Sequence, residues 1–254
     1  MSEDITKIKF TIQNSTVGDS VKTVAVDRDN IETIEEAPYI KVVCPVTIDK
    51  FAGGKITAQG FTDNEGTFGQ SRTLNINKYV NSVDTGEYDD SMKAIVNNMK
   101  QYSLYAQQFV NETSGLPNLD GDTAIASAAA KYKGSKTDAK SITYKGSQLL
   151  LGNAVTLRLV FTGGQPILTD SSYDYLGKKY AVRQSQSGEE YYVDIVGIPA
   201  FAVLHEFTIN YVDSDNFAGK VVYSPAKYLD TIVKGDYNSN EQNLARALYH
   251  HYCQ

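Results

Sequence analysis

The chain has 254 residues, of which 41% are hydrophobic and 21% charged, so it can form one large or two small folded domains and is not disordered. Its net charge of −6 argues against a nucleic-acid-binding surface, and no apolar run approaches the roughly 20 residues of a membrane-spanning helix. Two cysteines are too few for a disulfide scaffold or a zinc cluster. The first residues are acidic and no apolar segment follows them, so we expect no signal peptide.

Short strands are predicted along the first part of the chain. Residues 8–12 and 56–63 alternate between apolar and polar side chains, which is the period of a half-buried strand, and residues 39–43 form a further β-rich run. Turn-forming sequences at 53–54 and 63–66 separate these runs. Short strands at this spacing favour an antiparallel sandwich over a parallel sheet.

A long amphipathic helix is predicted at about residues 90–110. Acidic residues precede it, where the helix dipole favours negative charge, and apolar side chains then recur at helical spacing. They are Met92, Ile95, Val96, Met99, Tyr102, Ala106 and Phe109. We therefore expect a first β-rich unit at 1–110. Glycine and proline interrupt residues 111–146, which we expect to be a linker, and its stretch 124–133 is compatible with a short helix.

A second β-rich unit is predicted at 147–254. Alternating runs at 155–161, 192–196 and 207–213 predict strands, and Gly163-Gly164 marks a turn between the first two. In the first run the alternation predicts that Leu157 and Leu159 share one face and that Arg158 faces away from them. Residues 239–252 carry Leu244, Leu248 and Tyr252 on one stripe and predict a C-terminal helix.

The two units contain the same motif. The Lys-Tyr pair at 78–79 and the Gly-x-Tyr at 86–88 recur 149 positions later, at 227–228 and 235–237. The helical phase that follows also matches, because Ile95 falls on Leu244. The expected fold is therefore mainly β with helices, in the α+β class: two related antiparallel β-sandwich-like units, each followed by a C-terminal helix.

Several phrases of the second unit carry a family resemblance. They are the leucine-rich SQLLLGNAV at 147–155, YYVDIVGI at 191–198, YSPAKY at 223–228 and ALYHHY at 247–252; YSLYAQQF at 102–109 belongs to the first unit. This pattern resembles tandem β-sandwich-plus-helix modules of secreted and cell-surface proteins of gut Clostridia and Ruminococci, including starch-adherence (amylosome-type) proteins. Unit one departs from the pattern, with Cys44-Pro45 in place of the Gly-Ile step.

The resemblance implies an extracellular protein at the cell surface. It implies a non-catalytic module that binds a polysaccharide or oligosaccharide, with a starch-like α-glucan as the first ligand to test. The alternative is a structural spacer or a protein-docking and adhesion module without glycan binding, whose partners are other cell-surface proteins. No nucleic acid and no membrane insertion by this chain are expected.

Catalytic and metal-binding patterns are weak. His205 lies in an apolar run, and no G-x-S-x-G motif accompanies the three histidines. Glu189 and Glu190 are sequence neighbours in a predicted strand, so they point to opposite faces. The D-x-D-N strings at 27–30 and 213–216 lack the glycine and glutamate of a calcium-binding loop and favour a turn made by an aspartate side chain. We expect no enzyme, no cofactor and no metal.

Candidate ligand-binding residues lie in polar loops, where recognition residues concentrate. A sugar-binding surface needs an exposed aromatic ring flanked by hydrogen-bonding groups; the chain has no tryptophan, so tyrosine or phenylalanine must serve. The alternative for the main loop is a long hairpin whose tyrosines cap the sandwich. The candidates are Tyr173, Asp174, Tyr175, Lys178 and Lys179 in that loop, with Phe68 and Phe217 in two others.

Overall fold

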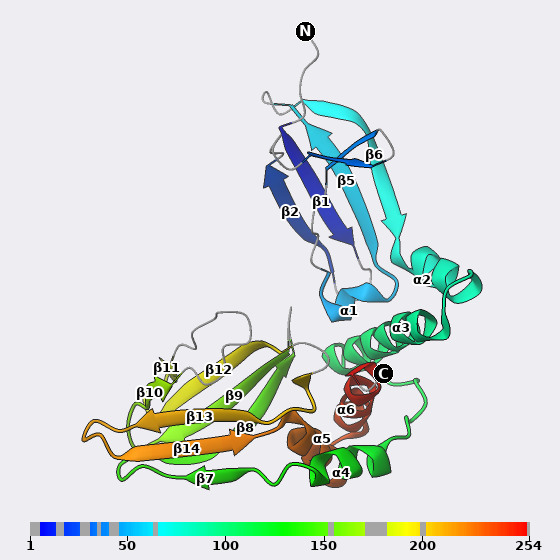
Figure 1. The fold of residues 1–254 in the computed structure, drawn as a ribbon. Helices are drawn as coiled ribbons and strands as arrows, with labels where there is room; N and C mark the ends of the chain where they lie inside the picture. Colours follow the sequence, from blue (N-terminus) through cyan, green and yellow to red (C-terminus); the bar gives the residue numbers. More distant parts are fainter. Residues whose placement is uncertain are drawn as a thin grey trace. The chain divides into compact units, whose positions relative to one another are not determined.

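A computed structural model describes residues 6–13, 18–25, 31–34, 37–40, 46–62, 66–151, 155–170, 182–198 and 202–252 (Figure 1). The chain divides into two compact units, Met1–Leu116 and Pro117–Gln254, which we call unit 1 and unit 2 and describe separately. Helices and antiparallel sheets occur in both, so the predicted α+β class is confirmed. No helix in the described ranges is long and apolar enough to cross a membrane.

Unit 1 is built on a four-stranded antiparallel sheet in the order β2-β1-β5-β6. Its strands are β1 (Lys7–Gln13), β2 (Ser20–Ala25), β5 (Lys55–Phe61) and β6 (Thr67–Asn75), and β3 (Ile31–Ile34) pairs with β4 (Ala37–Ile40) in a separate hairpin. Phe10 and Ile12 of β1 are buried on one face, as the alternation of their strand predicts, and Ile12 lies opposite Ile56.

The helices of unit 1 are α1 (Ile48–Phe51), α2 (Ile76–Thr85) and α3 (Asp90–Val110). A buried core of Ile76, Val80, Val83 and Val96 joins α2 to α3. The α3 helix spans the range in which a helix was predicted, but a second helix, α2, precedes it. The break between them is set by Asp89, whose carboxylate accepts a hydrogen bond from the Met92 backbone at 2.7 Å and caps α3.

Unit 2 contains two four-stranded antiparallel sheets, in the orders β10-β13-β14-β7 and β11-β12-β9-β8. Their strands are β7 (Ser135–Thr137), β8 (Thr143–Leu151), β9 (Val155–Thr162), β10 (Ile167–Asp170), β11 (Val182–Gln184), β12 (Glu190–Ile198), β13 (Phe207–Val212) and β14 (Ala218–Tyr223). The fully buried ring of Phe161 in β9 lies 5.0 Å from that of Tyr211 in β13 and 5.7 Å from that of Tyr144 in β8. These three rings join the two sheets in one core.

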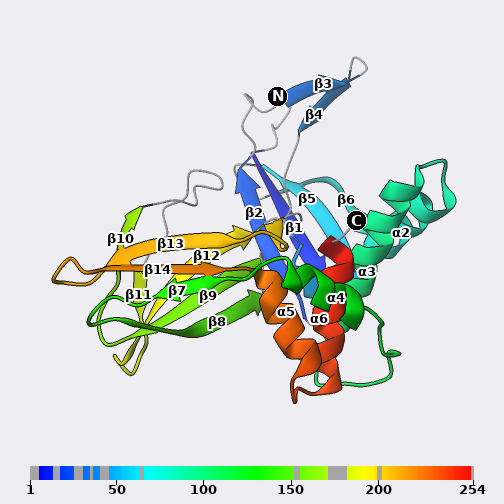
Figure 2. The same cartoon turned by 60° about the horizontal axis from the view of Figure 1, so that its bottom comes forward.

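The helices of unit 2 are α4 (Asp122–Ala130), α5 (Pro225–Lys234) and α6 (Ser239–Tyr252). They pack together at one end of the two sheets (Figure 2). The residues that we expected to be a linker with a short helix contain α4 and β7, and β8 begins within them. The buried side of α4 is made of Ile125, Ala128 and Ala129.

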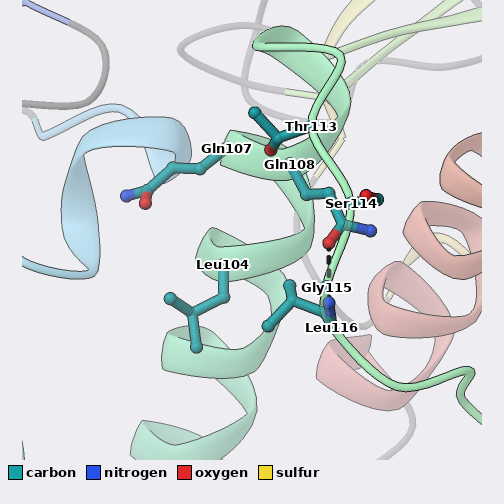
Figure 3. Close-up of a pocket in the computed structure, with 7 residues that line it drawn as sticks. All are labelled: Leu104, Gln107, Gln108, Thr113, Ser114, Gly115 and Leu116. Atoms are coloured by element: carbon teal, nitrogen blue, oxygen red, sulfur yellow. Dashed lines mark hydrogen bonds between the residues drawn. The ribbon is translucent and has the colours of Figure 1, made fainter.

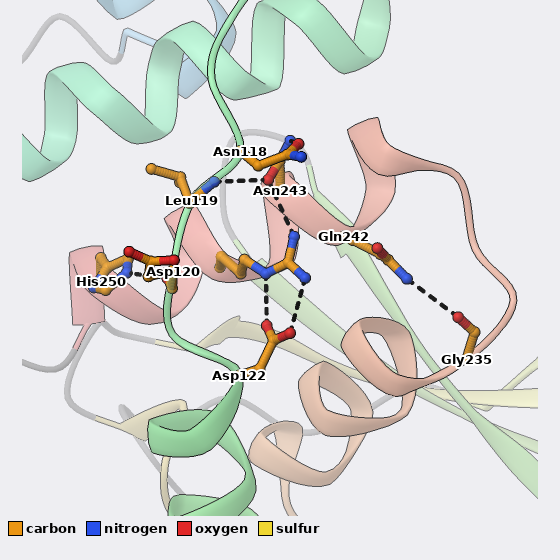
Figure 4. A network of polar contacts seen from close by, with 9 residues as sticks. Asn118, Leu119, Asp120, Asp122, Gly235, Gln242, Asn243 and His250 are labelled. Atoms are coloured by element: carbon orange, nitrogen blue, oxygen red, sulfur yellow. Dashed lines mark hydrogen bonds and ion pairs between the residues drawn. The ribbon is translucent and has the colours of Figure 1, made fainter.

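A polar network holds the chain segment before α4 against α6 (Figure 4). The Arg246 guanidinium donates to both carboxylate oxygens of Asp122, at 2.6 and 3.0 Å, and also to the side chain of Asn243. Asn243 accepts a hydrogen bond from the Leu119 backbone at 3.0 Å, and a ring nitrogen of His250 lies 2.7 Å from the Asp120 carbonyl oxygen. These contacts are structural, because they satisfy backbone groups of an irregular segment.

The repeated motif corresponds to a helix-turn-helix segment in each unit. α2 and α5 occupy matching positions of the repeat, and α3 and α6 begin at matching residues. A Cβ atom added to Gly235 would lie 2.7 Å from the Tyr237 ring, and one added to Gly86 would lie 3.1 Å from the Tyr88 ring. The repeated glycine and second tyrosine therefore form the same compact turn, so each copy has two helices after its sheet where one was predicted.

The surroundings of the repeat differ between the units. β14 has β7 on its outer side, whereas β6, its counterpart in unit 1, is the last strand of its sheet among the described residues. The Tyr228 of α5 is half-buried, whereas its counterpart Tyr79 of α2 is 51% exposed. In its described part, unit 1 has one four-stranded sheet and a hairpin where unit 2 has two four-stranded sheets.

Candidate functional site

Most of the predicted binding residues lie in the connection between β10 and β11. Tyr173, Asp174, Tyr175, Lys178 and Lys179 fall outside the described residues. The two strands that hold this connection are described: β10 pairs with β13 at the edge of one sheet, and β11 pairs with β12 at the edge of the other. The candidate loop therefore connects the edge strands of the two sheets of unit 2.

Phe68 belongs to unit 1, and the other six candidates belong to unit 2. The backbone of Phe68 lies in β6 opposite Gly60, and the Phe68 side chain is outside the described part of the structure. The predicted residues are thus not all in one folded unit.

Phe217 lies in the turn of the β13–β14 hairpin, directly before β14 begins, and is 47% exposed. The Lys140 ammonium nitrogen lies 4.9 Å from the centre of its ring, a cation–π distance. An exposed ring next to a lysine can pack against the apolar face of a sugar while the ammonium donates to a hydroxyl. Phe217 therefore remains a candidate for ligand contact on geometric grounds.

The buried carboxylate of Asp213 fixes the conformation of this hairpin. It accepts hydrogen bonds from the backbones of Asp215 and Phe217 and from both the backbone and the hydroxyl of Ser141, at 2.9–3.1 Å. Burial raises the pKa of Asp213, but these hydrogen bonds outweigh it, so the pKa lies below its usual range. The D-x-D-N string at 213–216 is thus an aspartate-based turn, as predicted, and Asn216 has the positive φ of 65° that such turns tolerate. The string at 27–30 lies outside the described residues.

A second group of polar side chains lies on the outer face of the β11-β12-β9-β8 sheet. Arg158 of β9 lies opposite Asp194 of β12 and donates to both of its carboxylate oxygens, at 2.7 and 2.9 Å. The Arg158 guanidinium also lies 4.4 Å from the centre of the Tyr192 ring. The Tyr192 hydroxyl donates to Glu190 at 2.9 Å. We call Arg158, Glu190, Tyr192 and Asp194 the Arg158 patch.

Two members of the Arg158 patch, Arg158 and Tyr192, keep their protonation state near neutral pH. The hydrogen bond to Asp194 raises the pKa of Arg158, so the guanidinium stays charged. The hydrogen bond to Glu190, with a smaller effect of burial, raises the pKa of Tyr192, so the phenol stays protonated and remains a donor. The patch therefore presents a neutral aromatic ring held by a compensated ion pair.

The patch lies next to the strand that follows the candidate loop in the sequence. β11 begins at Val182, directly after residues 171–181, and its Arg183 lies opposite Tyr192. Arg183 is exposed, as is Gln148, which lies opposite Arg158 on the other side. Sequence reasoning placed Arg158 away from the core but did not identify the patch, because only the strand register brings Arg158, Tyr192 and Asp194 together.

A small pocket occurs in unit 1 at the C-terminal end of α3 (Figure 3). It has a volume of about 200 Å³ and is lined by Leu104, Gln107, Gln108, Thr113, Ser114, Gly115 and Leu116. The two glutamines are used in the fold: Gln108 accepts from the Leu116 backbone, and Gln107 donates to the carbonyls of Asp49 and Ala52. The pocket has no charged side chain, so it offers little specificity for a ligand.

Within the described residues, no group of three or more histidine, cysteine, aspartate or glutamate side chains is arranged to hold a metal ion. No protein-family model matches the chain, and no significant similarity to a curated protein or a solved structure was found.

Proposed function

We propose that unit 2 is a non-catalytic carbohydrate-binding module of a bacterial cell-surface protein, and that a starch-like α-glucan is its first ligand to test. The observation that carries this proposal is the Arg158 patch on the outer face of the β11-β12-β9-β8 sheet. The ring of Tyr192 is held there by Arg158 at 4.4 Å, beside the strand that follows the tyrosine-containing loop.

The chemistry of the patch suits a neutral sugar. A pyranose ring has an apolar face, which packs on aromatic rings, and a rim of hydroxyls, which both donate and accept hydrogen bonds. Glu190 offers an acceptor beside the Tyr192 hydroxyl, and Arg183, opposite Tyr192, offers donors. Gln148, opposite Arg158 on β8, offers a further donor and acceptor on the same face. The positive charge of Arg158 and the negative charge of Asp194 compensate each other, so this pair does not require a charged ligand.

Binding by one such surface is expected to be weak. One aromatic contact contributes about 0.5–1.5 kcal/mol beyond area burial, whereas association itself costs several kcal/mol. We therefore expect a dissociation constant no tighter than on the order of 1 mM, which corresponds to about −4 kcal/mol. Adhesion to an insoluble polysaccharide then depends on many copies acting together on one cell surface.

Affinity electrophoresis of the whole chain in native gels cast with soluble starch tests the proposal. We expect retardation relative to a gel without polysaccharide, and loss of this retardation in Tyr173→Ala/Tyr175→Ala and in Tyr192→Ala. Tyr79→Ala is the matched control, because Tyr79 is a 51% exposed tyrosine of unit 1, and it should migrate like the wild type. Thermal unfolding of each variant separates loss of binding from loss of folding.

The outcomes distinguish the candidate functions. Binding to other glycans on an array, with loss in the same variants, would keep the site and change the sugar. Retardation that survives in both the loop and the Tyr192 variants would exclude the loop and the Arg158 patch as the site and would leave Phe217 and Phe68 as the remaining candidates. A wild-type chain that neither starch nor any arrayed glycan retains would favour a spacer or protein-docking module.

A further inference from the structure

We propose that the outer edge of β6 in unit 1 binds an extended peptide of a partner protein, as an added antiparallel strand with an acidic residue opposite Arg72. The proposal is independent of carbohydrate binding, because it concerns the other unit. It rests on a comparison of the two copies of the repeat, in which the corresponding edge of unit 2 is occupied.

The occupied edge in unit 2 defines the geometry. β7 pairs antiparallel with the outer edge of β14, so that Ser135, Lys136 and Thr137 lie opposite Val222, Val221 and Lys220. The two residues before this strand, Lys133 and Gly134, are each held by a hydrogen bond to a charged side chain. Lys227 at the start of α5 donates its ammonium hydrogen bond to the Lys133 carbonyl, and Glu206 accepts from the Gly134 backbone at 3.2 Å.

The same edge in unit 1 has no paired strand among the described residues. The β5–β6 hairpin precedes α2 as the β13–β14 hairpin precedes α5, and β6 is the outermost strand of its sheet in the described part of the chain. Every side chain of β6 from Thr67 to Leu74 that the structure describes is exposed. An exposed strand edge carries unpaired backbone donors and acceptors and is a template for another strand.

Both copies of the repeat have a lysine at the position that anchors the added strand in unit 2. Lys78 of α2 corresponds to Lys227 of α5 and is exposed. In an added strand with the register of β7, the residue three positions before the central one corresponds to Lys133. Its backbone carbonyl would lie near the ammonium of Lys78, as the Lys133 carbonyl lies near Lys227. No acidic residue stands at the positions of β5 that match Glu206, so this anchor consists of the lysine.

Arg72 selects the partner. It occupies the position of Val221, and it lies opposite Ala58 as Val221 lies opposite Ile209. The pairing of β5 with β6 has an irregularity between Phe68 and Arg72 that the β13–β14 pairing lacks, so the two edges match from Arg72 onward. The central residue of an added strand would therefore lie directly opposite the Arg72 side chain. In unit 2 this central residue is Lys136, and a lysine opposite Arg72 would place like charges side by side, which destabilises strand pairing. A strand with aspartate or glutamate at its centre has the complementary charge.

Peptides based on β7 test the proposal with the whole chain. The probe has the sequence of residues 131–140 with Lys136→Glu, and the control peptide has the unchanged sequence. We expect the probe to slow amide hydrogen exchange within residues 67–75 and to bind about threefold to tenfold more tightly than the control, from the charge at one strand pair. Arg72→Glu should reverse this preference, and Lys78→Ala should weaken both peptides, whereas Lys93→Ala should weaken neither.

Circular dichroism tests whether the variants fold. If Arg72→Glu does not fold, Arg72→Ala replaces it, and this variant should abolish the preference for the acidic peptide without reversing it. Unchanged exchange in residues 67–75 with either peptide would overturn the proposal. So would a preference that Arg72→Glu leaves intact, or protection confined to residues 218–223, which would mean that the peptide replaces β7 in unit 2.

Discussion

The ring of Tyr211 in β13 occupies the space above Gly219 in β14 that a side chain would fill. The two residues lie directly opposite each other in the hairpin, and a Cβ atom on Gly219 would lie within 2.7 Å of the Tyr211 hydroxyl oxygen and closer still to the ring carbons. Tyr211 is fully buried against Phe161, so it has no space into which to move. We therefore expect Gly219→Ala to lower the free energy of unfolding by about 2–3 kcal/mol.

Urea denaturation followed by near-ultraviolet circular dichroism measures this loss, because Tyr211 lies in the aromatic core. Gly146→Ala in β8 is the control: nothing lies within 4 Å of its added Cβ atom, so the change should be neutral or stabilising by about 0.5 kcal/mol. Equal stability of Gly219→Ala and the wild type would contradict the packing of Tyr211 over the glycine.

The carboxylate of Asp213 links the stability of unit 2 to acid pH. Its pKa is lower in the folded chain than its ordinary value of 3.8, because hydrogen bonds from Phe217, Ser141 and Asp215 outweigh burial. A lowered carboxyl pKa stabilises the fold fully above the ordinary value, and the stabilisation is lost as pH falls through the lower folded value. We expect Asp213→Asn to be less stable than the wild type at pH 7, with the difference shrinking as the pH is lowered from 7 to below 3.8.

Melting temperatures across this pH range provide the measurement. Asp215→Asn is the control, because Asp215 is an exposed residue of the same turn and its backbone, not its carboxylate, bonds to Asp213. It should reproduce the wild-type profile. A constant difference between wild type and Asp213→Asn at every pH would show that the carboxylate does not titrate with folding.

The long helices and the repeat could be predicted from the sequence because their signals are local. The apolar residues of α3 recur at helical spacing, and the Gly-x-Tyr turn stands at the same number of residues before α3 as before α6. α2 and α5 were not predicted because each has only ten residues, and a helix of this length is marginal by itself and depends on tertiary packing.

The Arg158 patch could not be predicted because it depends on register. Arg158 and Asp194 are far apart in the chain, and a shift of one residue between β9 and β12 would move Asp194 to the other face of the sheet. Alternation indicated that Arg158 faces away from the core, but it did not indicate its partner. The hairpin at Asp213, by contrast, is local, and its D-x-D-N sequence was sufficient.

The fork between Arg246 and Asp122 is expected to stabilise the docking of the segment before α4. The Arg246 side chain is 11% exposed and that of Asp122 is 53% exposed. Solvent therefore screens the carboxylate of the pair, whereas the guanidinium is largely shielded from it. We expect Arg246→Met to lower the free energy of unfolding by about 2 kcal/mol, because its hydrogen bond to Asn243 is lost as well, and Asp122→Asn by about 0.5–1 kcal/mol.

A double-mutant cycle on these two residues, measured by urea denaturation, should give a coupling of about 0.5–1 kcal/mol. Lys234→Ala is the reference for an exposed ion pair, since Lys234 pairs with Asp230 one turn earlier in α5, and it should lower stability by only about 0.3–0.5 kcal/mol. Strictly additive effects of Arg246→Met and Asp122→Asn would mean that the fork contributes nothing beyond packing.

The ion pair of the Arg158 patch allows a test of a buried charge left without its partner. The Asp194 side chain is only 7% exposed, so Arg158→Met leaves a desolvated carboxylate and should lower the free energy of unfolding by about 2–3 kcal/mol. Arg158→Met combined with Asp194→Leu should recover most of this loss, because no buried charge then remains. Arg183→Met, at an exposed position of the neighbouring strand, should stay within about 0.5 kcal/mol of the wild type. If the double variant is no more stable than Arg158→Met alone, the loss arises from packing of the arginine stem against Tyr192 and not from the carboxylate.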